Sequence, residues 1–146
     1  MSRRSAVAFV VLHASLLALL VSCASVPLFD QTAYQYAIDL KVDALSLMDK
    51  GTETFADHQD EVSALNTRLQ KAYEYARGRP HNVSATKQWK ILLDPERDLL
   101  GGFVTLWKSQ SRLSPAYVEE KKKQIADAFD IISGLESDRI KPSEVR

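Results

Sequence analysis

Apolar residues recur at three- and four-residue steps along most of this chain, and that spacing is typical of α-helices. No stretch alternates apolar and polar positions over a useful length, so strands are not expected. We predict helices at about 31–50 and 56–77, a third that begins at Ser84, and a fourth announced by Ser114 and Pro115. Short connections favour antiparallel neighbours. The predicted fold is therefore all-α, an antiparallel four-helix bundle with a kinked third helix.

The predicted second helix carries the cleanest apolar stripe, and Gly78 with Pro80 marks its end. Its stripe consists of Val62, Leu65, Leu69, Ala72 and Ala76. The third helix is expected to bury Trp89, Leu92, Leu99, Phe103, Leu106 and Leu113, and the fourth Val118, Ile125, Phe129 and Ile132. Ser84 and Ser114 are suited to cap helix N-termini, and Pro115 fits the first position of a helix. Together these stripes would form one apolar core.

Asp94 and Pro95 interrupt the third helical segment. Proline removes one backbone hydrogen bond and clashes with the preceding turn, and it pushes the residue before it away from helical angles. Either the helix kinks here, or Asp94 caps a new helix with Pro95 at its first position. Gly101 and Gly102 follow, and each costs about 1 kcal/mol in a helix relative to alanine. They mark either a hinge or groove that a partner's backbone approaches closely, or tight packing inside the bundle.

The predicted first helix has two apolar stripes. Tyr36, Leu40 and Leu47 form one stripe, which lies roughly 150–200° around the helix from the other at 100° per residue. The other stripe consists of Tyr34, Ile38, Val42, Leu45 and Met48. Because a helix in a bundle contacts two neighbours, both stripes can belong to the core. Alternatively, Tyr36, Leu40 and Leu47 are exposed and bind another protein or the membrane interface.

The N-terminal residues have the composition of a targeting segment. Arg3 and Arg4 precede an apolar run at 6–21 whose only ionisable residue is His13. As a helix, these 16 residues would span roughly 24 Å, less than a hydrocarbon core of ~30 Å. The run therefore fits a signal peptide over residues 1–22 better than the alternative, a permanent membrane helix with an incidental cysteine.

Leu20, Val21, Ser22 and Cys23 resemble the bacterial lipobox. The resemblance implies cleavage between Ser22 and Cys23, lipid on the Cys23 thiol, and acylation of the freed amine. Two or more acyl chains anchor a protein stably, whereas one alone binds a membrane only marginally. In Gram-negative lipoproteins an aspartate after the cysteine tends to hold the protein at the inner membrane, so Ala24 implies export to the outer membrane.

The mature part of the chain resembles small helical lipoproteins of proteobacteria over residues 88–107 and 113–118, and this resemblance implies no activity. Six residues, 24–29, separate the cysteine from the first helix and reach roughly 20 Å at most. The bundle would therefore lie against its membrane. The expected divisions are a signal peptide at 1–22, a lipidated cysteine and tether at 23–30, a helical bundle at 31–137 and a polar tail at 138–146.

Charge and cysteine content exclude several classes of protein. Arg3 and Arg4 are the only charged residues before Cys23, so the rest of the chain has two more acidic than basic residues. Such a domain has no basic face for nucleic acid. Cys23 is the only cysteine, which rules out an internal disulfide and a thiolate metal cluster.

No catalytic, metal or cofactor site is predicted. His58 and His81 fall near opposite ends of the second helix and are too far apart to share a metal ion. Among Asp94, Glu96 and Asp98, the first is expected to cap a helix, and nothing apolar or histidine-like is placed to tune the others for acid–base chemistry. We therefore expect a protein that is not an enzyme.

The function expected from these features is that of a lipid-anchored envelope protein, at the outer membrane and facing the periplasm. It would bind the membrane through Cys23 and serve as a structural or protein-binding module, with an envelope protein as partner. The alternative is a carrier of a small ligand or lipid, held between the helices. A cavity lined by Trp89, Phe103, Trp107 and Phe129 would favour the carrier, whereas a filled core with an apolar surface patch would favour the partner-binding module.

Overall fold

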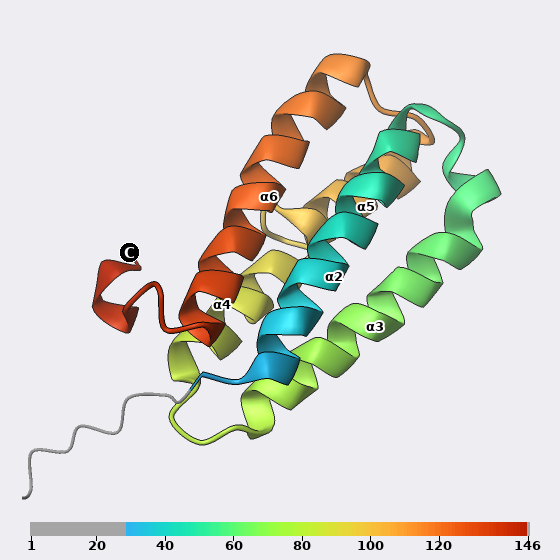
Figure 1. Ribbon diagram of the computed structural model, residues 1–146. Coiled ribbons are helices and arrows are strands. Elements are labelled where there is room, and N and C mark those ends of the chain that lie inside the picture. Colours follow the sequence, from blue (N-terminus) through green and yellow to red (C-terminus); the bar gives the residue numbers. More distant parts are fainter. Residues whose placement is uncertain (1–28, 146) are drawn as a thin grey trace, which may run out of the picture.

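The computed structural model describes residues 29–145, and this part of the chain is helical with no strand (Figure 1). The all-α prediction is therefore confirmed. The α-helices are α2 (Gln31–Asp49), α3 (Gln59–Gly78), α4 (Val83–Leu93), α5 (Leu100–Gln110) and α6 (Pro115–Glu136). Short 3-10 helices are η1 (Lys50–Thr52), η2 (Phe55–His58) and η3 (Pro142–Glu144). Ser22 and Cys23, the predicted cleavage and lipidation site, lie outside the described residues.

The long helices α2, α3 and α6 lie side by side, with α2 between the other two (Figure 1). On the opposite side of the core, α4 contacts both α3 and α6. Helix α5 follows α4 along the chain and contacts η2 at the other end of the molecule. The apolar faces of all five helices contribute to one core.

Two of the predicted helices, α3 and α6, bury their faces as expected. Helix α6 also begins where it was predicted, whereas α3 begins at Gln59, after η2, and not at about residue 56. Ser114 caps α6, because its side chain accepts a hydrogen bond from the backbone N–H of Tyr117, and Pro115 occupies the first turn. On α3, the predicted stripe is buried at Leu65, Leu69, Ala72 and Ala76, and Val62 is half-buried at its edge. The matching face of α6 is buried at Val118, Ile125, Phe129 and Ile132.

The prediction of a kinked third helix was wrong, because the chain forms two separate helices there. Helix α4 ends at Leu93, and residues 94–99 are not helical. Asp94 has extended backbone angles (φ −66°, ψ 119°), as a residue before proline prefers. Its carboxylate does not cap α5; it accepts a hydrogen bond from the backbone N–H of Glu96 at 2.9 Å. The predicted cap at Ser84 was also wrong, since α4 begins one residue earlier, after Asn82.

Gly101 and Gly102 are tightly packed, but against the end of α4 and the turn before α5 and not between helices of the bundle as one alternative had it. A Cβ atom on Gly101 would clash with the backbone carbonyl oxygen of Leu93, and one on Gly102 would clash with that of Arg97. The segment at 94–99 therefore lies directly on the first turn of α5. Any larger side chain at these positions would have to displace backbone, which cannot move as freely as a side chain.

Leu40 and Leu47 are buried, so the predicted partner surface on Tyr36, Leu40 and Leu47 was wrong. Leu40 is 1% exposed and Leu47 is 7% exposed, whereas Tyr36 is 40% exposed. Helix α2 packs on α3 and α6 along a face whose small members are Ala33, Ala37 and Ala44. Val42, in the other stripe, was expected to lie in the core, but it is 63% exposed. The pattern of large residues alone could not reveal this face, because alanines let the helices approach.

The core is filled by its aromatic residues. Trp89, Phe103, Trp107 and Phe129 are all 1% exposed or less. The rings of Trp89 and Phe129 meet edge to face with centroids 5.8 Å apart, and Phe103 contacts Trp107 at 6.2 Å. These side chains pack on one another and do not line an open space between the helices.

Candidate functional site

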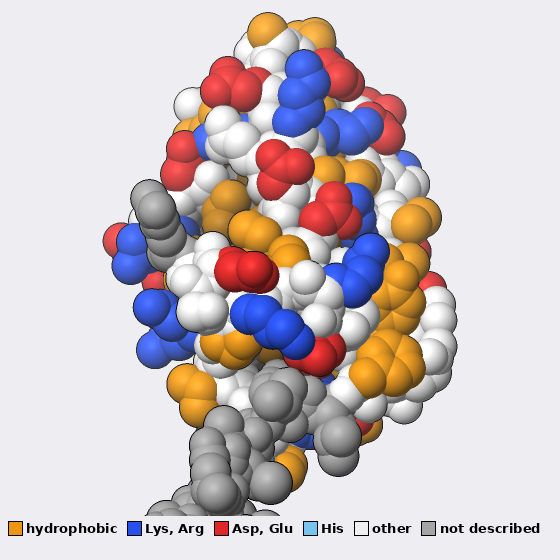
Figure 2. All heavy atoms as spheres, turned by 60° about the vertical axis from the view of Figure 1, so that its left-hand side comes forward, with side chains coloured by type: hydrophobic (Ala, Val, Ile, Leu, Met, Phe, Trp, Pro, Cys, Tyr) orange, Lys and Arg blue, Asp and Glu red, His pale blue; other side chains and the backbone are white. Residues whose placement is uncertain are grey.

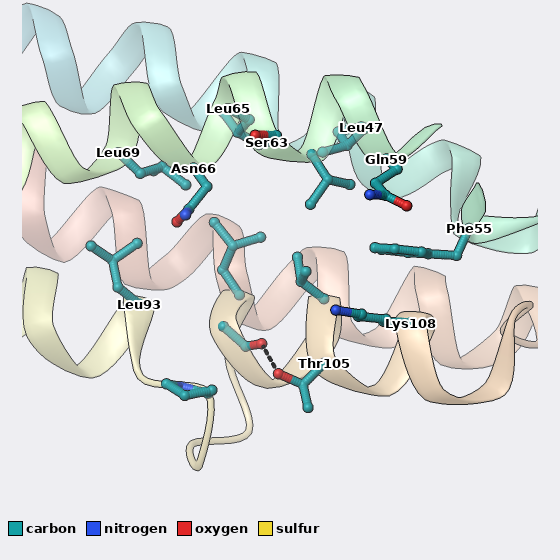
Figure 3. Close-up of a pocket in the computed structure, with 15 residues that line it drawn as sticks. Leu47, Phe55, Gln59, Ser63, Leu65, Asn66, Leu69, Leu93, Thr105 and Lys108 are labelled. Carbon is teal, nitrogen blue, oxygen red and sulfur yellow. Dashed lines mark hydrogen bonds between the residues drawn. The ribbon is translucent and has the colours of Figure 1, made fainter. Parts of the chain in front are cut away.

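A groove of about 390 Å³ lies between α3 and α5 (Figure 3). It is open to solvent along one side, and its floor and much of its walls are apolar. Its lining residues are Leu47, Phe55, Gln59, Val62, Ser63, Leu65, Asn66, Leu69, Leu93, Pro95, Leu100, Gly101, Val104, Thr105 and Lys108. We call this hollow the α3–α5 groove.

The α3–α5 groove exists because the third helical segment is broken at Pro95. Up to Leu93, α4 packs closely on α3, but after the turn at 94–99 helix α5 diverges from α3 and contacts η2 instead. Pro95 itself lines the groove where the two helices separate.

Leucine side chains form the floor of the groove. Leu65 and Leu69 line the groove from α3, and Leu93 points toward Leu69 from the end of α4 (Figure 3). Leu65 and Leu69 are buried and Leu93 is half-buried, so the floor is continuous with the core. A bound apolar group would therefore extend the core outward, at about 25 cal/mol for each Å² of apolar surface removed from water.

The rim of the groove on α3 is polar but uncharged. Gln59, Ser63 and Asn66 line it, and Gln70 continues the row into an adjoining hollow of about 360 Å³. These four residues recur at steps of four, three and four, so they occupy one edge of the helix. All four are exposed. Their amide and hydroxyl groups can each donate or accept hydrogen bonds from a bound molecule.

The opposite rim carries two lysines. Lys108 lines the α3–α5 groove at one end, and Lys90 lines the adjoining hollow, which shares Leu93 and Pro95 with the groove. Neither lysine makes an ion pair with any other residue between 29 and 145. The one acidic residue that lines either hollow is Asp94, whose carboxylate already accepts the Glu96 N–H. The groove therefore offers positive charge that is not paired with any acidic side chain in the described part of the chain.

Elsewhere the visible surface shows no concentration of one charge. Acidic and basic side chains are interspersed over the face in Figure 2, and neither sign gathers into a continuous patch there. Several of these charges pair between helices, such as Lys41 with Asp130 at 2.6 Å and Lys122 with Asp49. Such exposed pairs contribute about 0–1 kcal/mol each to stability. They form a solvated surface around the bundle.

His58 sits at the end of the groove where η2 meets α3. Its two ring nitrogens lie 3.1 Å from a carboxylate oxygen of Glu61 and 2.7 Å from one of Glu53. The His58 ring also packs on Trp107, with centroids 5.8 Å apart. The hydrogen bonds to Glu61 and then Glu53 raise the pKa of His58 above its ordinary value of 6.5. Lys50 lies 2.5 Å from Glu61 on its other side and lowers the pKa of that carboxyl.

The raised pKa of His58 predicts that the fold is more stable in mildly acidic than in alkaline solution. Because the protonated ring is favoured in the folded state, its contribution is complete below pH 6.5 and is lost as the pH rises through the folded pKa. We expect His58→Gln to flatten this part of the stability profile, measured as melting temperature between pH 6 and about 8.5. Gln110→Ala, an exposed change that removes no ionisable group, is the control and should keep the slope. An unchanged slope in His58→Gln would contradict the prediction.

A buried charged cluster holds the end of the bundle where the described chain begins. Arg79 pairs with Glu136 and lies 3.2 Å from Asp30. Asn82 donates to Glu136 and to the carbonyl oxygen of Ala76, both at 3.1 Å. Burial acts to raise the pKa of Asp30, but the Ala33 N–H, the Tyr75 hydroxyl and Arg79 outweigh it and lower that pKa. The cluster joins the start of α2 to the ends of α3 and α6.

Two of the acidic residues around Pro95, Asp94 and Asp98, have structural partners. Asp98 pairs with Lys121, which is 5% exposed and also lies over the ring of Tyr117. Burial first, and then the charge of Asp98, raise the pKa of Tyr117. Between residues 29 and 145, no three His, Cys, Asp or Glu side chains are arranged to hold a metal ion.

The α3–α5 groove was missed by sequence reasoning, although part of its signal was present. Pro95 and the Gly101–Gly102 pair were recognised as an interruption, but the consequence for the direction of α5 was not. Asn66 and Gln70 alone carry no signal of a site. In the part of the chain that the structure describes, no helix combines the length and apolar composition needed to cross a membrane.

No model of a known protein family matches this chain, and comparisons with curated proteins and with solved structures likewise found no match.

Proposed function

We propose that this chain is a lipid-anchored envelope protein that docks another protein in its α3–α5 groove. The observation that carries this proposal is an open apolar groove beside a core that is otherwise filled. Apolar floors with polar rims are typical of protein-binding surfaces. No enzymatic activity is proposed.

The anchor is the lipid on Cys23, by resemblance of Leu20 to Cys23 to the lipobox. Ala24 favours delivery to the outer membrane, with the bundle facing the periplasm. Asp30, at the start of α2, is held to the ends of α3 and α6 by Arg79 and Glu136. The six-residue tether would therefore connect the membrane to a firmly held end of the bundle. The groove would then be held within reach of membrane proteins and their periplasmic parts.

For the fold, we propose an antiparallel four-helix arrangement in which α4 and α5 together take the place of the third helix. The carrier of a small ligand or lipid is the second candidate function. The observation in its favour is also the α3–α5 groove. The aromatic residues expected to line a cavity for the ligand pack on one another instead, Trp89 on Phe129 and Phe103 on Trp107. The two functions differ in what occupies the groove in cells.

In-cell photocrosslinking at Thr105 tests the docking function. A photoreactive residue at this exposed position on the groove should give one or a few defined crosslinked protein bands, and Asn66→Arg should remove them by blocking the groove. A photoreactive residue at Lys123, exposed on α6, is the control and should not give the same bands. Crosslinks only to lipid would support the carrier instead.

The anchor is tested separately with Cys23→Ser. We expect this variant to stay unprocessed and to lose metabolic labelling with palmitate, because the thiol that accepts the lipid is gone. Normal processing would overturn the lipoprotein assignment. Ala24→Asp, the companion variant, should move the protein to inner-membrane fractions.

A further inference from the structure

We infer that the α3–α5 groove takes an amphipathic α-helix about four turns long, acidic along one edge, from the partner protein. This inference rests on the proposed docking function and adds the form and charge of the occupant. Three features carry it: the length and walls of the groove, the uncharged row on α3, and the unpaired lysines on α4 and α5.

The length of the groove matches a short helix. Together with the adjoining hollow it follows α3 from Gln59 to Tyr73, which corresponds to ~21 Å at 1.5 Å per residue. A helix of about 14 residues has this length. Both walls are themselves helices, so they present ridges and grooves into which the side chains of a third helix can pack.

The uncharged row on α3 favours a polypeptide occupant over an acyl chain. Gln59, Ser63, Asn66 and Gln70 place donors and acceptors along the whole edge. A helix laid in the groove brings polar side chains to that edge, where they can form hydrogen bonds. An acyl chain has no group that could use them beyond its head. Arg68 lies on the other side of α3, outside this row. Glu74 follows Gln70 by four residues but does not line either hollow, and it pairs with Arg77.

The charge on the opposite rim sets the orientation of the occupant. Lys90 and Lys108 border the two ends of the combined hollow and have no ion-pair partner among residues 29–145. Acidic side chains on the edge of the bound helix that faces α4 and α5 would pair with them. Leucine-like side chains at three- and four-residue steps would cover Leu65, Leu69 and Val104.

Selection from a display library tests this inference. The library encodes 15-residue peptides with all positions random and is presented to the full-length protein in lipid nanodiscs. We expect enriched peptides to show apolar residues at helical spacing and acidic residues along one edge. The double variant Lys90→Glu, Lys108→Glu should weaken their binding by about tenfold, since attraction is replaced by repulsion at two rim positions. Lys87→Glu, Lys123→Glu is the matched control and should retain the affinity.

Three outcomes would overturn the inference. The first is that the enriched peptides lack apolar residues at helical spacing, and the second is that the selection enriches no peptide. The third is that the selected peptides bind the charge-reversed variant as tightly as the parent protein. Sodium palmitate provides a further arm: if palmitate shifts the backbone NMR signals of Val104 and Thr105 and no peptide does, the groove is a lipid site. The proposed docking function is judged independently by the protein crosslinks from Thr105. If these persist while no helix is enriched, docking stands and the helical occupant does not.

Discussion

Replacing Glu136 by alanine is expected to lower the free energy of unfolding by about 3–5 kcal/mol, the usual cost of removing one partner from a buried ion pair. The Glu136 side chain is completely buried, and Arg79, its partner, is only 15% exposed. Glu136 also lies at the C-terminal end of α6, where the helix dipole disfavours negative charge. Without Glu136, Arg79 would lose its buried partner, and the side-chain amide of Asn82 would lose an acceptor.

Urea unfolding followed by circular dichroism measures this loss. Glu74→Ala is the matched control, because Glu74 pairs with Arg77 at an exposed site and should cost less than about 1 kcal/mol. The double variant Arg79→Met, Glu136→Leu should lose less than Glu136→Ala alone, since it leaves no unpaired buried charge on this pair. Equal losses for Glu136→Ala and Glu74→Ala would show that the cluster does not hold this end of the bundle.

Replacing Trp107 by alanine is expected to cost about 3–5 kcal/mol, as large-to-small changes of buried aromatic residues usually do. Trp107 is fully buried, and its ring meets Phe55 edge to face at 5.3 Å. The indole N–H also donates to the backbone carbonyl oxygen of Glu53 at 3.0 Å. The side chain therefore fixes η2 and the end of α5 together, and its removal would leave a cavity beside the α3–α5 groove.

The loss can be separated into packing and hydrogen bonding by comparing variants. Trp107→Phe keeps an aromatic ring but leaves the Glu53 carbonyl without its donor, so it should cost less than Trp107→Ala. Val83→Ala is the control, because Val83 is 78% exposed and changes of this kind usually stay within about 0.5 kcal/mol. A cost for Trp107→Ala near that of the control would contradict the packing described for this end of the core.

Local patterns were sufficient where a helix has one apolar face and a clear end. The α3 stripe through Leu65 and Leu69 and the start of α6 at Ser114 and Pro115 followed from residue spacing and capping chemistry. Local patterns failed on α2, where the face that packs on the core includes alanines, which are only weakly hydrophobic. Leu40 was assigned to a possible surface for this reason, although two neighbouring helices cover it.

The sequence by itself determined that the described chain is helical, where α6 begins and that the chain is interrupted at Pro95, because each depends on interactions within a few residues. Only the tertiary structure decided what the interruption does. The direction of α5 after Pro95 depends on packing around Trp107, whose indole N–H donates to the carbonyl oxygen of Glu53, a residue far away in the chain. The α3–α5 groove is the result of that direction, and so no local pattern could have revealed it.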